Sequence, residues 1–72
     1  MQHAMQLREL RGKVVGLVGF GQIARQVARR VHGFDALVRY SKPRPATPEE
    51  EQPSGARHRG FDELLAESDI LS

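Results

Sequence analysis

The chain has 72 residues, 39% of them hydrophobic, with a formal net charge of +2, and can form one small domain with a modest core. It contains no cysteine, which excludes disulfides and thiolate metal sites and favours an intracellular setting. No apolar run reaches the length of a membrane span and the N-terminus lacks the apolar core of a signal peptide, so we expect a cytoplasmic protein without a membrane partner.

The first eleven residues carry a few apolar side chains, Met5, Leu7 and Leu10, among polar ones. This spacing suits a short lead-in helix or a linker, and Gly12 marks the turn into the part that follows. His3 stands alone near the terminus, so we assign it neither a catalytic nor a metal-binding role.

An apolar strand is predicted over residues 14–18. Its side chains Val14, Val15, Leu17 and Val18 form a continuous apolar run, which is typical of a central parallel strand buried on both faces. A glycine-rich turn follows directly and leads into a helical pattern that ends before Gly33.

The predicted helix has an apolar and a basic side. Its expected buried face consists of residues spaced four apart and the small residues beside them: Ile23, Val27 and Val31, with Ala24 and Ala28. Its solvated face is formed by Arg25, Gln26, Arg29 and Arg30. We therefore expect an amphipathic helix that packs on the preceding strand.

Charge is unevenly divided along the chain. Residues 1–45 carry nine Lys or Arg against two acidic residues, and residues 46–72 carry two against seven. A basic half of this kind could bind nucleic acid, but its arginines spread over one helix face and no set of stacking aromatics accompanies them. Solvated helix surface and one phosphate pocket explain the basic residues better, so we expect no nucleic-acid partner.

The turn between strand and helix has the GxGxxG/A arrangement, at residues 19–24. Gly19 permits the tight turn, Gly21 lets a pyrophosphate approach the backbone, and Ala24 lets the helix sit close to the strand. Amide groups at Gly21, Gln22 and Ile23 would point out of the helix start, where the helix dipole favours an anion. The pattern predicts a phosphate site built mainly from backbone.

A single glycine motif also marks ordinary turns that bind nothing, so its context matters. Here it follows a strand and opens a helix, and a second strand is predicted at residues 36–40. Gly33 suits a left-handed residue at the helix end. The three elements form a βαβ unit, which favours dinucleotide binding over a purely structural turn.

The end of the second strand indicates which dinucleotide is bound. In NAD-specific sites this strand ends with an acidic residue that accepts hydrogen bonds from the adenosine ribose. Here the strand is followed by Ser41, Lys42 and Arg44, without an acid. A hydroxyl and two cations suit the 2′-phosphate of NADP(H), and the alternative is a basic loop bound to nothing.

The second half of the chain is less regular. Residues 43–55 are rich in proline and predict a surface loop with one acidic helical turn beginning at Pro48. A short edge strand is predicted at residues 56–59, and a helix at 61–67. The inward side chains of this helix are expected to be Leu64 and Leu65. A further strand starts at Asp69 and is not completed.

Three blocks of sequence together resemble the nucleotide-binding domain of the D-isomer-specific 2-hydroxyacid dehydrogenases. They are residues 10–24, which read G-K-x-V-G-x-V-G-x-G-x-I at their core, residues 33–35, and residues 61–70, which contain D-E-L-L-x-x-S-D. The resemblance covers nearly the whole chain. It implies an α/β fold with a Rossmann-type, doubly wound parallel sheet, of which residues 12–72 would form an incomplete fragment after a lead-in segment at 1–11.

The resemblance also implies roles for individual residues. It assigns Gly19, Gly21, Gln22 and Ile23 to the pyrophosphate, and it aligns Lys42 with the acid that NAD-preferring members use. Without that acid the chain is similar to the NADPH-using glyoxylate and hydroxypyruvate reductases. NADP(H) is therefore the favoured cofactor and NAD(H) the second candidate.

By this resemblance the complete protein is an oxidoreductase that moves hydride between the nicotinamide and C2 of a 2-keto acid. The family's catalytic Arg, Glu and His lie downstream, so this chain is expected to hold no catalytic residue, and no metal ligand is assigned. The implied partners are a small 2-keto or 2-hydroxy acid and a second copy of the protein. The alternatives are a non-catalytic, dinucleotide-sensing module of corepressor type and a flavin or S-adenosylmethionine domain, which the D-E-L-L block disfavours.

Overall fold

The structure is a computed structural model and describes residues 7–72, so the first six residues of the predicted lead-in segment lie outside the described residues. Its helices are η1 (Leu7–Leu10), α1 (Gln22–His32), α2 (Pro48–Glu51), η2 (Gln52–Ser54) and α3 (Phe61–Glu67), where η denotes a 3₁₀ helix. Its strands are β1 (Val14–Val18), β2 (Leu37–Ser41), β3 (Arg57–His58) and β4 (Ile70–Leu71).

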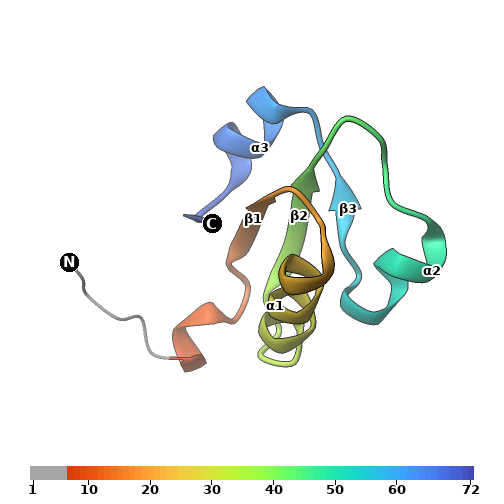
Figure 1. The fold of residues 1–72 in the computed structure, drawn as a ribbon. Helices are drawn as coiled ribbons and strands as arrows, with labels where there is room; N and C mark the ends of the chain where they lie inside the picture. Colours follow the sequence, from red (N-terminus) through yellow and green to blue (C-terminus); the bar gives the residue numbers. More distant parts are fainter. Residues whose placement is uncertain (1–6) are drawn as a thin grey trace.

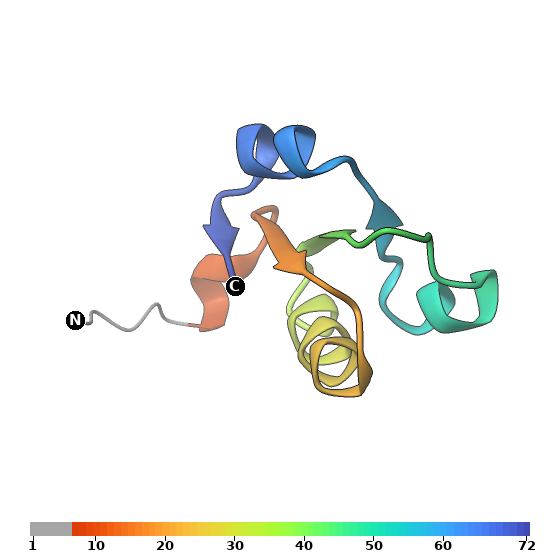
Figure 2. The same cartoon turned by 45° about the horizontal axis from the view of Figure 1, so that its top comes forward.

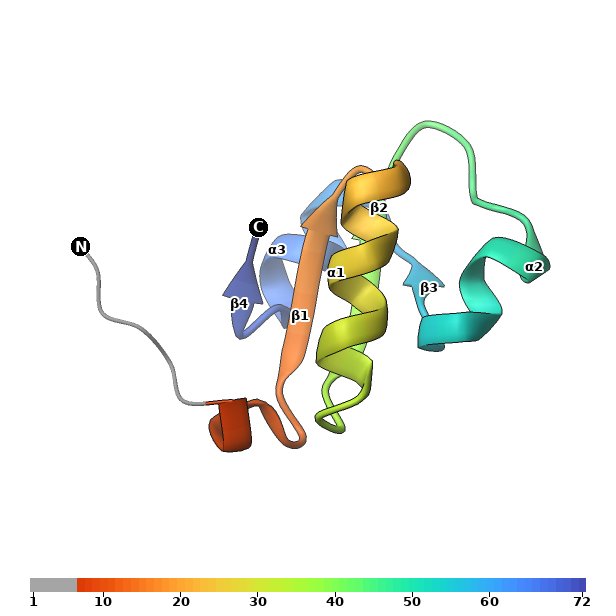
Figure 3. The same cartoon turned by 60° about the horizontal axis from the view of Figure 1, so that its bottom comes forward.

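A four-stranded parallel sheet in the order β3-β2-β1-β4 forms the centre of the described part (Figure 1). β1 pairs with β2 from Val14 opposite Leu37 to Val18 opposite Ser41. Helix α1 covers one face of the sheet and α3 the other (Figures 2 and 3). The predicted α/β class with a parallel sheet is confirmed.

Burial along β1 differs from the prediction at its last residue. Val15 and Leu17 are each 3% exposed, as expected for a central strand. Val18, which the sequence predicts to be buried, is 57% exposed. The prediction is wrong for Val18 because it stands at the carboxyl edge of the sheet, where its side chain lines an open hollow.

Helix α3 packs closely on β1 through the glycine in the middle of that strand. A Cβ on Gly16 would lie 3.2 Å from Leu64 Cδ1 and would overlap the side chain of Ser68. Leu64 is fully buried, whereas Leu65 is 47% exposed, so its predicted inward position is wrong. Neighbouring positions on a helix point about 100° apart, and so short a helix turns only one of them to the sheet.

The buried face of α1 is rotated relative to the predicted one. Ala28 is fully buried, and Ala24 and Val31 pack partly buried against the core. Ile23 and Val27, predicted to be buried, are 76% and 37% exposed. The small alanines allow the helix axis to approach the sheet, so the contact centres on Ala28 and the larger residues lie at its side.

The left-handed residue after α1 is not the predicted one. Gly33 has φ −62°, in the ordinary helical region; its N–H donates to the Arg29 carbonyl, and the Phe34 N–H donates to the Val31 carbonyl. Asp35 instead has φ 66°, and its N–H donates to the His32 carbonyl. The prediction for Gly33 is wrong because the helix continues for one more turn of backbone bonds, and an aspartate tolerates the left-handed conformation that reverses the chain.

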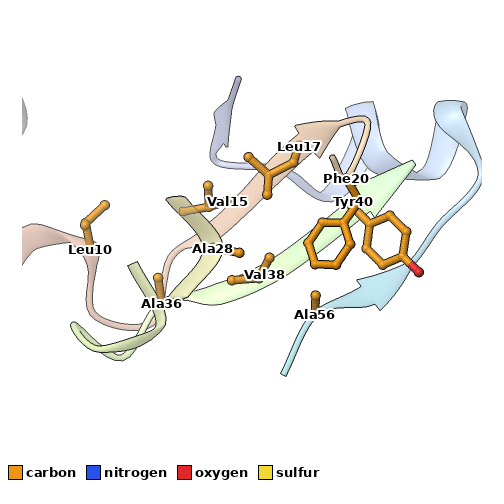
Figure 4. Packing of buried hydrophobic residues seen from close by; sticks show 9 residues of the cluster. All are labelled: Leu10, Val15, Leu17, Phe20, Ala28, Ala36, Val38, Tyr40 and Ala56. Atoms are coloured by element: carbon orange, nitrogen blue, oxygen red, sulfur yellow. The ribbon is translucent and has the colours of Figure 1, made fainter. Parts of the chain in front are cut away.

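Two aromatic residues fill the core beneath the glycine turn, as Figure 4 shows. The rings of Phe20 and Tyr40 stack with their centroids 4.3 Å apart, and both side chains are buried. Phe20 occupies a variable position of the GxGxxG/A motif. Its side chain therefore anchors the turn to β2 and leaves the backbone of the turn on the outside.

The Tyr40 hydroxyl fastens the loop after β2 to the core. It donates to Glu51 Oε2 at 2.6 Å and accepts from the Ala46 amide at 2.7 Å. Burial and the Glu51 hydrogen bond raise the pKa of Tyr40 to about 12. The segment predicted as a surface loop with one acidic turn contains α2 and η2 and is folded back on the sheet by this side chain.

Replacing Tyr40 by phenylalanine should lower the free energy of unfolding by about 1–3 kcal/mol, because Glu51 and the Ala46 amide lose a buried partner. The pH dependence should change as well. Because the pKa is raised in the folded state, the contribution of the neutral phenol is complete below about pH 10 and is lost as the pH rises to about 12. Urea unfolding at pH 8, 10 and 12 checks this. An equal alkaline loss in Tyr40→Phe would contradict it.

Candidate functional site

Three of the predicted site residues, Gly19, Ser41 and Lys42, meet at the carboxyl edge of the sheet, where β1 and β2 end side by side. Gly19 follows β1 with φ +97°, a conformation that side chains rarely adopt. Its N–H donates to the Ser41 carbonyl at 2.7 Å. This bond holds the glycine turn against the end of β2, and it brings Gly19 and Ser41 together as the parallel pairing requires.

The start of α1 exposes backbone donors. Gly21 is the N-cap residue, no side chain caps the helix, and its first turn holds no acidic residue. Within residues 7–72 no acceptor is recorded for the amides of Gly21, Gln22 and Ile23, whereas the Arg25 amide bonds to the Gly21 carbonyl. Unpaired amides at a positive helix end are what a phosphate group binds.

Gly21 is not required by the local backbone. Its φ of −75° suits any residue, and a Cβ built on it would meet nothing within 4 Å. Gly19 also has open space at its Cβ, but its positive φ needs glycine. The backbone conformation therefore requires glycine at position 19 but not at position 21. The open space beside Gly21 suits the close approach of a ligand.

An open hollow of about 520 Å³ lies over the ends of the strands. Ser41 and Lys42 line it together with Gly19, whereas Arg44 is exposed and is not among the lining residues. The full lining is Val18, Gly19, Ser41, Lys42, Pro43, His58, Gly60 and Phe61. Gln22 lines a neighbouring hollow of about 330 Å³ between α1 and α2, and Ile23 stands exposed beside it in the first turn of α1.

His58 at the end of β3 is a residue of this hollow that the sequence did not identify. Its Nε2 lies 2.9 Å from the carbonyl oxygen of Lys42, and its ring meets the edge of Tyr40 with centroids 5.3 Å apart. The imidazole thus fixes the backbone on which Lys42 stands. The signal in the sequence is the short strand predicted at 56–59: parallel pairing of this strand with β2 places His58 opposite Tyr40, close to Lys42.

Glu50, which lines the neighbouring hollow between α1 and α2, is a second residue that the sequence did not identify. Its carboxylate accepts from Arg25 Nη1 at 2.9 Å and from the Thr47 amide at 3.1 Å. The Thr47 amide bond lowers the pKa of Glu50, and the positive charges of Arg25 and Lys42 lower it further. The signal in the sequence is Thr47-x-x-Glu50, the pattern of a capping box, which the structure contains.

Residues 7–72 contain neither a cluster of potential metal ligands nor a membrane-spanning helix. No group of three or more His, Asp or Glu side chains there could hold a metal ion. The helices in this part of the chain are all too short or too polar to cross a membrane. The described site thus offers backbone donors at the start of α1, and a hydroxyl and an ammonium group in the lining of an open hollow.

Comparison with known proteins decides the family. The whole chain, residues 1–72, matches the model of the D-isomer specific 2-hydroxyacid dehydrogenase NAD binding domain. The chain belongs to this family. The match is to the NAD-binding domain of the family, so a nicotinamide dinucleotide cofactor is supported.

Individual relatives of this 2-hydroxyacid dehydrogenase domain agree. The chain is 45% identical over 60 residues to a glyoxylate reductase of Thermococcus kodakarensis. The aligned region is 83% of this chain and 18% of the relative. It also resembles the crystal structure of a glyoxylate reductase from Paecilomyes thermophila, with a TM-score of 0.78 and 43% identity over 85% of this chain and 18% of that one. A second similar crystal structure is that of D-mandelate dehydrogenase from Rhodotorula graminis, with a TM-score of 0.79 and 36% identity over 86% of this chain and 19% of that one. The chain thus spans less than a fifth of each relative.

The residues of this domain fit the dinucleotide of the 2-hydroxyacid dehydrogenases. The open space beside Gly21 and the amides of the first turn of α1 belong to the glycine turn, which the bond from the Gly19 amide to the Ser41 carbonyl holds against the hollow over Ser41 and Lys42. Pyrophosphate needs the first two features, and an adenosine ribose needs the third.

Proposed function

We propose that the complete protein is an NAD(P)-dependent oxidoreductase acting on the CH-OH group of 2-hydroxy acids, and that NADP(H) is its preferred cofactor. When bound, the nicotinamide supplies the hydride. The chain described here contributes residues 12–72 as part of the dinucleotide-binding domain, and the substrate is a small 2-keto acid such as glyoxylate or hydroxypyruvate. A second copy is expected as partner, and the cysteine-free sequence supports a cytoplasmic location.

The preference for NADP(H) is supported by the side chains at the end of β2. Ser41 and Lys42 line the hollow, and no carboxylate is among its lining residues. An acid at this place would repel a 2′-phosphate, whereas a hydroxyl and an ammonium group can each donate a hydrogen bond to it. We assign Gly19, Gly21, Gln22 and Ile23 to the pyrophosphate, Ser41 and Lys42 to the 2′-phosphate, and the exposed Arg44 to a weaker, outer contact.

Changing Lys42 to aspartate in the complete protein should raise the Michaelis constant for NADPH roughly ten- to a hundredfold and change that for NADH much less. A charge-assisted hydrogen bond contributes about 1.5–3 kcal/mol, and the new carboxylate would repel the 2′-phosphate. Steady-state kinetics with glyoxylate or hydroxypyruvate and both cofactors measures this difference.

The matched control is Arg44→Asp, which makes the same change of charge two residues away and outside the hollow. It should affect NADPH less than Lys42→Asp does. Equal losses with both cofactors, or a wild type that prefers NADH, would disprove the preference. Tight dinucleotide binding without turnover of any 2-keto acid would point instead to a sensing module of corepressor type.

A further inference from the structure

An ion pair joins α1 and α2. Arg25 in the first turn of α1 pairs with Glu50 at 2.9 Å, with both side chains about one third exposed. The charge of Lys42 also acts on the Glu50 carboxylate. Glu50 thus forms an ion pair with the cation at the helix start, and the ammonium group that follows the end of β2 acts on it only through its field, since no Lys42–Glu50 ion pair is present among residues 7–72.

Glu50 is held in this place by the fold. Its Oε1 accepts from the Thr47 amide at 3.1 Å, and its own amide donates to Thr47 Oγ1 at 3.2 Å. The carboxylate of the next residue, Glu51, accepts a hydrogen bond from the hydroxyl of the buried Tyr40 at 2.6 Å, and this bond fixes α2 to the core. The Glu50 carboxylate is thus positioned from both sides and is not a freely moving surface acid.

We propose that Glu50 is a specificity-determining residue, an internal competitor for the 2′-phosphate: it pairs with Arg25, a cation that a phosphate on the adenosine ribose would otherwise use, and its negative charge opposes that phosphate near Lys42. This inference rests on the proposed function and adds two residues to it. Arg25 becomes a donor to the phosphate when its partner is neutralised, because a guanidinium binds phosphate oxygens as readily as a carboxylate. Glu50 restrains the preference for the phosphorylated cofactor.

The test uses Glu50→Gln in the complete protein, with Glu49→Gln as the matched control. Glutamine keeps the capping-box acceptor and removes only the charge. Glu49 lies beside Glu50 on α2, is exposed, and has no ion pair within residues 7–72, so its replacement makes the same change in net charge. The probes are 2′,5′-ADP and 5′-AMP, which differ by the 2′-phosphate, and titration calorimetry measures their dissociation constants.

Glu50→Gln should bind 2′,5′-ADP about three- to tenfold more tightly and 5′-AMP unchanged, the size expected for one nearby charge that is partly screened by solvent. Glu49→Gln should change both less than twofold. The gain should shrink at high salt and should be reversed by adding Arg25→Gln. Equal effects of the two glutamine variants, or weaker binding by Glu50→Gln, would overturn the inference. A wild type that binds neither probe would overturn the proposed function itself.

Discussion

Replacing Gly21 by valine should weaken dinucleotide binding by at least about a hundredfold, or about 2.7 kcal/mol, while the fold remains intact. The backbone of Gly21 has φ −75°, which valine can adopt, and no protein atom lies within 4 Å of the added Cβ. The new methyl groups would occupy the space through which the pyrophosphate reaches the amides of the helix start. Titration calorimetry with NADPH and NADH measures the loss.

The control for this variant is its own stability, together with the smaller Gly21→Ala. Circular dichroism and the melting temperature should match those of the wild type in both, and alanine should weaken binding less than valine does. Gly19→Val would not serve, because the φ of +97° makes any side chain there strained and would mix folding with binding. Wild-type affinity in a folded Gly21→Val protein would refute the assignment of Gly21.

Replacing Gly16 by valine should lower the free energy of unfolding by about 3 kcal/mol or more, the largest effect on stability that we expect from a single change in this chain. The Cβ alone would overlap Ser68 and press on Leu64, and both belong to the packed junction of α3 and β4. Since the obstruction is the body of a side chain in a short connection, the strand and the helix would have to separate. Urea unfolding measures the change.

A second substitution, at Ser68, separates the effect of steric overlap with the new side chain at position 16 from the effect of losing the flexibility of glycine there. Gly16→Ala combined with Ser68→Gly should recover much of the stability lost in Gly16→Ala, because the overlapping side chain is removed. Ser68→Ala alone should be neutral or slightly stabilising, since Ser68 Oγ is buried and has no hydrogen-bond partner among the described residues. A Gly16→Ala protein as stable as the wild type would show that the junction can adapt without cost.

The order of elements from β1 to β2 could be predicted because local signals agree there. The apolar run predicts a strand, the glycine pair predicts a tight turn and the helical spacing predicts a helix, and the three signals follow one another directly in the sequence. The rotation of α1 could not be predicted. Its sequence offers both the Ile23 and Val27 side and the Ala24 and Ala28 side as apolar, and only contact with the sheet selects the alanines.

The candidate site was predictable where it follows from one motif and not where it depends on distant pairing. Gly19, Ser41 and Lys42 meet because neighbouring parallel strands end at the same edge of a sheet, which follows from the βαβ connection alone. His58 and Glu50 reach the site through β3 and α2, which are too short to have a periodic signal. Tyr40 contacts both regions: its hydroxyl bonds to Ala46 and Glu51 and fixes the segment that carries Glu50, and its ring contacts that of His58.

The central position of β1 affects how the chain can fold while it is being synthesised. One edge of β1 is covered by β2 about twenty residues later, but the other pairs with β4, where the Asp69 amide donates to the Val14 carbonyl at 2.8 Å and the Asp69 carboxylate accepts from the Val14 amide at 2.8 Å. The chain must therefore be synthesised and exposed through Leu71 before β1 is paired on both sides. Until then, one edge of the apolar strand is open to pairing with another chain.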